Sequence, residues 1–377
     1  MKTKLILLLC CCALAADATD LESLQCKNEN GTIVDWYVLY KLPKISSSSN
    51  PLIRQGVAYA YITNATVNQG WKLSTRSIKS ALSIPGRTLD LLYKDNVARK
   101  IAWLLYSDQA PDVPAKPTFG HAKGAVVADL VDGFWMIHSV PNFPSDTRYH
   151  YPDSGERNGQ SFLCISIKSE ELDVISPQLV YNQVIPYSYH IPEDFPQRSS
   201  LVDVSQRPTI RNPPFYRKQV IKSMRGTEFT SFAKTSKWQR ELYGDFVAPQ
   251  LQASLMVESW QNGRGKLPSK CQAMRVYNVD SILLEAANIQ FSSTLDHSKW
   301  AVTASNRNNK NWICIGDINR ADGQLNRGGG TVCLNSSALR RAYKGLINDY
   351  ERCPEVRKQV STTSAPKVTP TGTTSKN

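Results

Sequence analysis

In this chain of 377 residues, two copies of a His-x-Lys motif are the clearest indication of catalytic chemistry. The first copy is His121-Ala122-Lys123 and the second is His297-Ser298-Lys299. An imidazole titrates near ~6.5, so it can act as nucleophile, base or acid. A neighbouring lysine supplies a positive charge for a phosphate oxygen. Two such pairs that face each other would lie on either side of one phosphodiester, and this arrangement predicts that one of the histidines attacks its phosphorus. One histidine would form a phosphohistidine, and the other would protonate the leaving oxygen.

The two motifs occur in similar surroundings. His121 precedes Trp135 by 135 − 121 = 14 residues, and His297 precedes Trp312 by 312 − 297 = 15. In each copy an apolar run, a polar turn and a second apolar run follow the motif, which predicts a β-hairpin. Residues two apart in a strand point to the same side, so each histidine should project with its lysine. The polar turns are 129–133 and 305–311.

A third histidine is expected near the first motif. If the turn 129–133 pairs Ala128 with Phe134, then His138 lies across from Gly124, close to Lys123. We therefore predict that His138 supports the site or contacts phosphate. A packed position beneath the site is the alternative.

We expect neither a metal nor another cofactor. The sequence has no cluster of Asp, Glu and His with metal-ligand spacing, and no Cys-x-x-Cys pair. In this prediction the two lysines take the role that metal ions take in other proteins.

The elements that must position the motifs indicate a mixed α/β class. Residues 33–40 are rich in β-formers and predict a strand. Apolar spacing over 77–107 and over Phe232–Val257 predicts helices, which alternate with the strands of the hairpins. The length suits one large domain or two halves that share a core.

The chain ends indicate secretion. Lys2 and Lys4 precede an apolar run, Leu5–Leu14, which is too short to span a bilayer and overlaps an Ala-x-Ala cleavage signal. We predict a signal peptide over residues 1–18. Residues 354–377 are rich in Ser, Thr and Pro and predict a disordered tail.

Cysteine usage agrees with a secreted protein. Six cysteines follow the predicted signal peptide, and an even number outside the cytosol indicates disulfides. Their spacing does not choose among the fifteen possible pairings. Three Asn-x-Ser/Thr sequons predict glycosylation, at Asn30, Asn64 and Asn335. The cysteines are Cys26, Cys164, Cys271, Cys314, Cys333 and Cys353.

The charge favours a polyanionic partner. The formal net charge is +13 at pH 7, and the pI is about 9.3. Nucleic acid, an anionic glycan and an anionic lipid all remain candidates on this ground alone. In an acidic compartment, carboxylates and histidines would bind protons and the charge would rise.

The wider sequence resembles a known family. The His-x-Lys motifs are similar to those of the phospholipase D superfamily, and the segments around them resemble deoxyribonuclease II. The similarity covers roughly residues 26–353. The segments that carry it are Val34-Asp35-Trp36, Tyr40-Lys41-Leu42-Pro43, Leu104-Leu105-Tyr106-Ser107-Asp108-Gln109, Gly120-His121-Ala122-Lys123-Gly124, Gly133-Phe134-Trp135, His138-Ser139-Val140-Pro141-Asn142-Phe143-Pro144, Ser231-Phe232-Ala233-Lys234, Asp296-His297-Ser298-Lys299-Trp300, Gly316-Asp317-Ile318-Asn319-Arg320 and Arg327-Gly328-Gly329-Gly330-Thr331.

The resemblance implies a fold and an activity. The fold would be two pseudo-repeated phospholipase D-like halves, each a β-sheet flanked by helices, which form one clamp around duplex DNA. The catalytic domain would span 19–353, with halves at about 19–200 and 201–353. The reaction would be metal-independent hydrolysis of double-stranded DNA at acid pH, leaving 3′-phosphate and 5′-hydroxyl ends. It would degrade apoptotic or ingested DNA, in lysosomes or outside the cell.

The resemblance also implies particular site residues. By analogy with the superfamily, His121 would be the nucleophile and His297 the general acid, although the reverse order stays open. Asn319 and Arg320 would support the site or contact phosphate. The disulfides would be Cys26–Cys164, Cys271–Cys353 and Cys314–Cys333. The sequence departs from the superfamily seven residues after each histidine, where Ala128 and Ala304 replace an acidic residue.

Two other functions remain candidates at this point. The first is a phospholipase D-like phosphodiesterase on the same scaffold, against which the basic charge argues. The second is a secreted DNA-binding protein that has lost activity, against which the presence of both motifs argues. In each case we expect no stable membrane association and no obligate protein partner.

Overall fold

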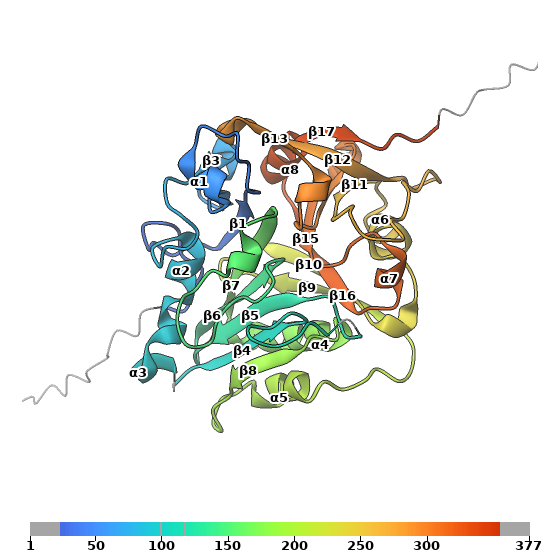
Figure 1. Cartoon of the computed structure of the whole chain (residues 1–377). Coiled ribbons are helices and arrows are strands. Elements are labelled where there is room, and N and C mark those ends of the chain that lie inside the picture. Colours follow the sequence, from blue (N-terminus) through green and yellow to red (C-terminus); the bar gives the residue numbers. More distant parts are fainter. Residues whose placement is uncertain (1–22, 99, 117, 355–377) are drawn as a thin grey trace, which may run out of the picture.

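The computed structural model describes residues 23–98, 100–116 and 118–354. The predicted signal peptide lies outside these residues, as does the predicted tail apart from Pro354. The described chain is mixed α/β, with two β-sheets and a few short helices. In Figure 1 the blue to green strands of the first sheet run from β3 at the upper left to β8 at the bottom, and the second sheet runs from β12, β13 and β17 at the upper right to the yellow β9 and β10 near the middle.

The first sheet contains eight strands in the part of the chain that the structure describes, in the order β3-β2-β1-β7-β6-β5-β4-β8. All of its strands precede residue 191. They are β1 (Trp36–Lys41), β2 (Tyr59–Thr63), β3 (Lys72–Leu73), β4 (Ala102–Ser107), β5 (Lys123–Ala128), β6 (Asp132–His138), β7 (Gln160–Lys168) and β8 (Pro186–His190).

The second sheet contains nine strands within the same described ranges, in the order β13-β12-β11-β14-β15-β16-β10-β9, with β17 paired to β12. They are β9 (Tyr216–Lys222), β10 (Glu228–Lys234), β11 (Leu255–Glu258), β12 (Val276–Leu284), β13 (Ile289–Ser292), β14 (Trp300–Thr303), β15 (Trp312–Gly316), β16 (Gly329–Asn335) and β17 (Ile347–Tyr350).

The helices are short and lie between the strands. They are α1 (Pro51–Gln55), α2 (Ile84–Leu89), α3 (Asp95–Ala98), α4 (Leu172–Tyr181), α5 (Arg198–Gln206), α6 (Ala248–Leu251), α7 (Asp322–Leu325) and α8 (Ser337–Lys344). A π-helical turn, Tyr243–Val247, leads into α6.

Five neighbouring strands run in the same order in both sheets. The order β4-β5-β6-β7-β1 corresponds to β11-β14-β15-β16-β10, and each neighbouring pair is antiparallel. The outer strands differ, because β8 pairs antiparallel with β4 whereas β12 pairs parallel with β11. The two His-x-Lys motifs lead into β5 and β14, which occupy matching places in this common order.

The sheets bury one apolar cluster between them. Alternate residues of a strand point to opposite faces. Trp36 and Val38 of β1 therefore enter this shared cluster, as do Trp300 and Val302 of β14. The intervening Tyr37 instead enters a separate cluster on the outer face of the first sheet. Helices α4 and α8 add leucines to the shared cluster and contact strands of the second sheet.

The two long helices predicted over 77–107 and Phe232–Val257 are wrong. The first segment contains only short helical turns, and Leu104 and Leu105 belong to β4. The second begins in β10 and ends in β11, with a 3-10 turn over Ser236–Trp238 and short helices over 243–251. Both faces of β4 are buried, with Leu104 in the shared cluster and Leu105 in the outer one. A strand buried on both faces lacks polar–apolar alternation, so the pattern was mistaken for a helix.

The six cysteines form the three disulfides that the resemblance implies, Cys26–Cys164, Cys271–Cys353 and Cys314–Cys333. Cys314 and Cys333 face each other on β15 and β16. This bond therefore closes the loop 317–328, which carries several residues of the site described below.

Candidate functional site

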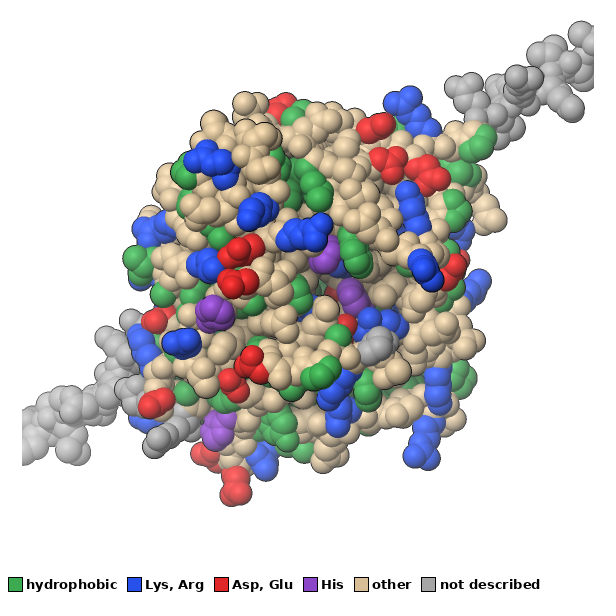
Figure 2. All heavy atoms as spheres, in the orientation of Figure 1, with side chains coloured by type: hydrophobic (Ala, Val, Ile, Leu, Met, Phe, Trp, Pro, Cys, Tyr) green, Lys and Arg blue, Asp and Glu red, His purple; other side chains and the backbone are tan. Residues whose placement is uncertain are grey.

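Both His-x-Lys pairs reach one cavity of about 340 Å³. In Figure 2 two histidine side chains lie close together near the middle of the face, with lysine and arginine side chains nearby. The cavity is lined from both sheets, as the sequence predicted for facing motifs. Its lining residues are Asp108, Gln109, Ala115, His121, Lys123, Ser139, Trp260, His297, Lys299, Asn319, Gln324 and Arg327.

Each histidine is anchored by its backbone to the other half of the chain. The His121 N–H donates to the carbonyl of Gly328 at 2.9 Å, and the His297 N–H donates to the carbonyl of Gly159 at 2.8 Å. Both acceptors precede matching strands, β16 and β7. Glycine is required at these positions, because an added Cβ would lie 2.4 Å from Asp296 Oδ1 at Gly159 and 2.6 Å from Asn182 O at Gly328.

The ring of His121 is held in one tautomer. Its Nδ1 bonds to the backbone carbonyl of Asp317. A carbonyl only accepts, so Nδ1 carries the proton and Nε2 keeps its lone pair. Burial, together with the positive charge of Lys123, lowers the pKa of His121 well below its usual value. A neutral imidazole with a free Nε2 lone pair is the form that can attack phosphorus.

Lys123 is paired with a buried carboxylate. Its Nζ lies 2.5 Å from Asp108 Oδ1, while Arg327 Nη2 donates to Asp108 Oδ2 at 2.9 Å. Burial acts to raise the pKa of Asp108, but the positive charges of Lys123 and Arg327 outweigh it and hold that pKa well below normal. The ionised Asp108 therefore fixes the lysine of the first motif and an arginine from the second half of the chain.

The second motif has different neighbours. The ring centroids of His297 and Trp260 lie 4.4 Å apart in an edge-to-face arrangement, and His297 Nε2 has no hydrogen-bond partner among the described residues. Burial, then Lys299 and Lys123, lower the pKa of His297 to about 3. Lys299 Nζ donates to the carbonyl of His297 at 2.6 Å, and burial lowers its pKa to about 7.

Buried acidic groups lie behind the second motif. Asp296 accepts hydrogen bonds from the Tyr40 hydroxyl and from Ser298, and burial raises its pKa. Glu258 is fully buried, and its two carboxyl oxygens have no partner within the described part of the chain. Burial, then the nearby Asp296, raise the pKa of Glu258 well above its usual value. Among the described residues, neither carboxyl group forms an ion pair with Lys299, whereas Asp108 forms one with Lys123.

The other predicted site residues are distributed differently. Asn319 lines the cavity, and its Oδ1 accepts from the backbone N–H of Trp260 at 3.3 Å. Arg320 is buried outside the lining and bonds through its guanidinium to Asn278 and to Pro268 O. The structure therefore brings Asn319, but not Arg320, to the lining.

His138 is packed beneath the cavity. It contacts the rings of Phe143 and Phe162, accepts from the Val140 N–H through Nδ1, and leaves Nε2 unpartnered among the described groups. The predicted hairpin register is wrong by one residue, because Ala128 pairs with Gly133 rather than with Phe134. Strand β6 begins at Asp132, which shortens the turn and aligns His138 with Lys123.

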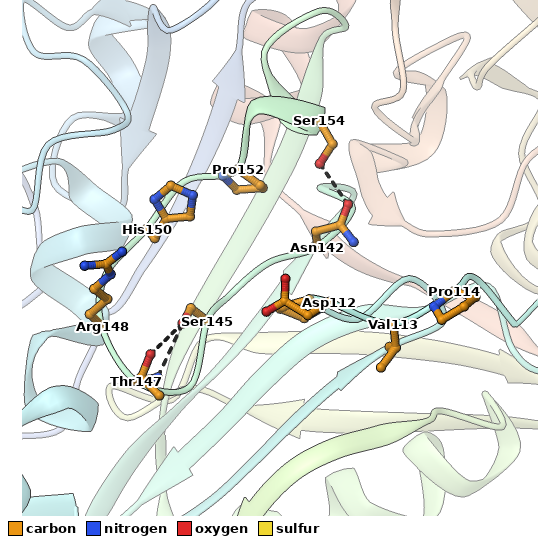
Figure 3. Close-up of a pocket in the computed structure, with 11 residues that line it drawn as sticks. Asp112, Val113, Pro114, Asn142, Ser145, Thr147, Arg148, His150, Pro152 and Ser154 are labelled. Atoms are coloured by element: carbon orange, nitrogen blue, oxygen red, sulfur yellow. Dashed lines mark hydrogen bonds between the residues drawn. The ribbon is translucent and has the colours of Figure 1, made fainter.

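A second cavity, of about 690 Å³, lies across the loop 109–115 from the first. Figure 3 shows Arg148 and His150 on one side of it and Asp112 and Val113 on another. It is the larger of the two but has no paired histidine and lysine, so the candidate active site is the smaller cavity.

Three further observations bear on the sequence predictions. Across residues 23–98, 100–116 and 118–354, no three His, Cys, Asp or Glu side chains are grouped so that they could hold a metal ion. No helix in those ranges is long and apolar enough to cross a membrane. Of the sequon asparagines, Asn30 and Asn335 are exposed and Asn64 is half-buried.

Comparison with known proteins decides the family. A sequence model of the family Deoxyribonuclease II matches residues 25–353. The chain belongs to the deoxyribonuclease II family. Plancitoxin-1 of Acanthaster planci is 37% identical over 338 residues, which cover 88% of this chain and 93% of that protein. Human deoxyribonuclease-2-beta is 35% identical over 340 residues, covering 88% and 92%. Cell death-related nuclease 6 of Caenorhabditis elegans is 35% identical over 350 residues, covering 90% and 92%.

Several residues of the candidate site were not predicted from the sequence. Asp108, Arg327 and Asp317 come from segments that the resemblance includes, but no spacing rule connects them with a distant lysine or histidine. Trp260 lies in none of those segments. A buried charge needs a partner of opposite sign, so an Asp directly after an apolar strand was the one available signal for Asp108.

Proposed function

We propose that the protein is an acid endonuclease that hydrolyses double-stranded DNA without a metal ion, leaving 3′-phosphate and 5′-hydroxyl ends. Membership of the deoxyribonuclease II family supports the deoxyribonuclease activity. The observation that carries the mechanism is the pair of His–Lys motifs on one cavity, with Nε2 of His121 unprotonated.

The first step forms a phosphohistidine. Nε2 of His121 attacks phosphorus, and the bond from phosphorus to the 5′ oxygen breaks as His297 gives that oxygen a proton. Lys123 and Lys299 stabilise the charge that develops on the non-bridging oxygens. In the second step a water molecule attacks phosphorus, His297 takes its proton, and the bond to His121 breaks. A 3′-phosphate monoester remains.

The acid requirement follows from the pKa shifts. Burial and the charge of the lysines lower the pKa of both histidines, so neither readily holds a proton before DNA binds. A bound phosphodiester brings a negative charge, which raises the pKa of His297. We expect activity to fall as pH rises through the pKa of His297 in the complex. The alkaline limb should lie at higher pH for kcat than for kcat/KM, which reports the free enzyme.

The two sheets would form a phospholipase D-like clamp around the duplex. Matching five-strand orders and the reciprocal anchoring of the two histidines support two halves, 19–200 and 201–353. A formal net charge of +13 suits a phosphate backbone. Three disulfides and the predicted signal peptide support a lysosomal or secreted enzyme. Degradation of apoptotic or ingested DNA would then be its role.

Supercoiled plasmid nicking tests this function. We expect nicking and linearisation at pH 5 that continue in excess EDTA, and products that a polymerase extends only after phosphatase treatment of their 3′ ends. Activity that collapses in EDTA and returns with Mg²⁺ would contradict the mechanism. Hydrolysis of phosphatidylcholine without nicking would indicate a phospholipase D-like phosphodiesterase, and binding without nicking would indicate an inactive DNA-binding protein.

A further inference from the structure

Two buried lysines outside the motifs occupy matching places in the two sheets. Lys41 is the last residue of β1 and pairs with Gln160, the first residue of β7. Lys234 is the last residue of β10 and pairs with Gly329, the first residue of β16. Both side chains are fully buried. A buried lysine is costly, so its hydrogen-bond partners indicate what it stabilises.

Both ammonium groups donate only to backbone carbonyls in the bonds that the structure shows. Lys41 Nζ donates to Gly56 O at 3.2 Å and to Glu156 O at 2.7 Å. Lys234 Nζ donates at 2.6 to 3.2 Å to carbonyls at the end of α7 and in the loop that joins α7 to β16: Gln324, Leu325 and Arg327. Each lysine therefore holds the loop that leads into its neighbouring strand.

Those two loops end at the histidine anchors. Glu156 lies three residues before Gly159, which accepts the His297 N–H, and Arg327 directly precedes Gly328, which accepts the His121 N–H. We propose that Lys41 and Lys234 are positioning residues that act crosswise: Lys41 fixes His297, and Lys234 fixes His121. The role in catalysis rests on the proposed function, whereas the positioning does not.

The ammonium groups of Lys41 and Lys234 are charged at the acid pH of the proposed reaction. Burial lowers the pKa of Lys41 to about 7 and that of Lys234 to about 8. At pH 5 both therefore keep all three N–H donors. The same loops also bind the histidine segments at further points, because the Gly159 N–H donates to Leu295 O at 2.8 Å and Arg327 Nη2 donates to Gly120 O at 3.3 Å. Each lysine therefore acts by holding a loop to which its histidine segment is bonded.

Residue-resolved amide hydrogen exchange of the whole protein at pH 5, without DNA, tests the crosswise arrangement. Lys41→Met should speed exchange of the His297 amide about ten-fold or more and leave the His121 amide within about two-fold. Lys234→Met should do the reverse. Lys44→Met, at an exposed lysine close to the first position, should change neither amide. Equal loosening of both amides, or of neither, in the two buried variants would overturn the proposal.

Kinetics give a second readout. We expect kcat for plasmid nicking to fall about ten- to hundred-fold in each buried variant while KM stays within about three-fold, because displaced reacting groups cost rate rather than binding. Lys41→Gln and Lys234→Gln keep an N–H donor, so they should restore part of the protection of the histidine amides against exchange. Where a methionine variant does not fold, the corresponding glutamine variant is measured in its place. Absence of nicking by the parent protein would overturn the proposed function and leave the exchange test intact.

Discussion

The two His–Lys pairs occupy matching strands but differ in what surrounds them. Ser107 pairs with Lys123, and Glu258 pairs with the residue after Lys299, so Asp108 and Trp260 fall at equivalent places after β4 and β11. In the first half this place holds a carboxylate that binds Lys123. In the second half it holds an aromatic ring against His297.

The difference indicates that the two motifs have distinct tasks. Polar groups hold the first pair in place: Nδ1 of His121 bonds to a carbonyl and Lys123 bonds to a carboxylate, while Nε2 of His121 keeps its lone pair. The second pair is open, with His297 Nε2 unpartnered among the described residues and Lys299 bonded to a backbone carbonyl. A fixed, neutral ring suits the nucleophile, whereas an open ring suits a group that must exchange protons with DNA and water.

Removal of either imidazole should have the largest effect. His121→Ala and His297→Ala should each lower the rate of DNA cleavage by about 10³-fold or more, because neither step proceeds without both rings. Nicking rates at pH 5 measure this, with circular dichroism to show that the variants fold. A folded variant that keeps a tenth of the parent activity would break the two-histidine account.

The carboxylate should matter more than the ring at the equivalent place. Asp108→Asn leaves Lys123 and Arg327 without an anion, so we expect a loss of about 3 kcal/mol of stability and about ten- to hundred-fold in kcat. Trp260→Phe keeps an aromatic ring and should cost less than about ten-fold. Urea unfolding and nicking rates measure both variants. Equal losses of stability and of kcat in the two variants would contradict the claim that the carboxylate of Asp108 matters more than the ring of Trp260.

The smallest effect is expected at His138, whose ring packs against Phe143 and Phe162. His138→Phe should keep kcat within about three-fold, because the ring lies among aromatic side chains outside the cavity lining. A loss as large as that of His121→Ala would instead make His138 a catalytic residue.

The same variant should alter acid stability. Burial lowers the pKa of His138 to about 3. Between that value and the unfolded value of ~6.5, the unfolded chain binds a proton that the folded chain does not, so stability falls as pH falls. His138→Phe removes this loss, and we expect it to retain about 2 kcal/mol more of its pH 7 stability at pH 5. His150→Phe, at an exposed histidine, is the control for urea unfolding at both pH values.

The catalytic pairs could be predicted because their signal is local. His-x-Lys within a hairpin puts both side chains on one face, and two copies suggest two facing sites. Asp108 and Arg327 are 219 positions apart and meet only through tertiary packing, which no local pattern encodes. The roles of Lys41 and Lys234 were hidden for the same reason, since their carbonyl partners belong to distant loops.

The fold was harder to predict where both faces of a strand are buried. Leu104 and Leu105 occupy opposite faces of β4, and both faces are covered by apolar clusters. Their run of apolar residues is compatible with a buried helix or a buried strand. The disulfide pairing likewise needed the family resemblance, because spacing leaves all fifteen pairings open.

Capture of the covalent intermediate tests the central claim most directly. A duplex labelled on the strand upstream of the cut is mixed with enzyme at pH 5, quenched within milliseconds in alkali, and digested for peptide mapping. We predict label on the peptide that contains His121, bound through a phosphorus–nitrogen bond, and no label on the His297 peptide. Label on His297, or steady cleavage with no labelled peptide at any time point, would contradict the account.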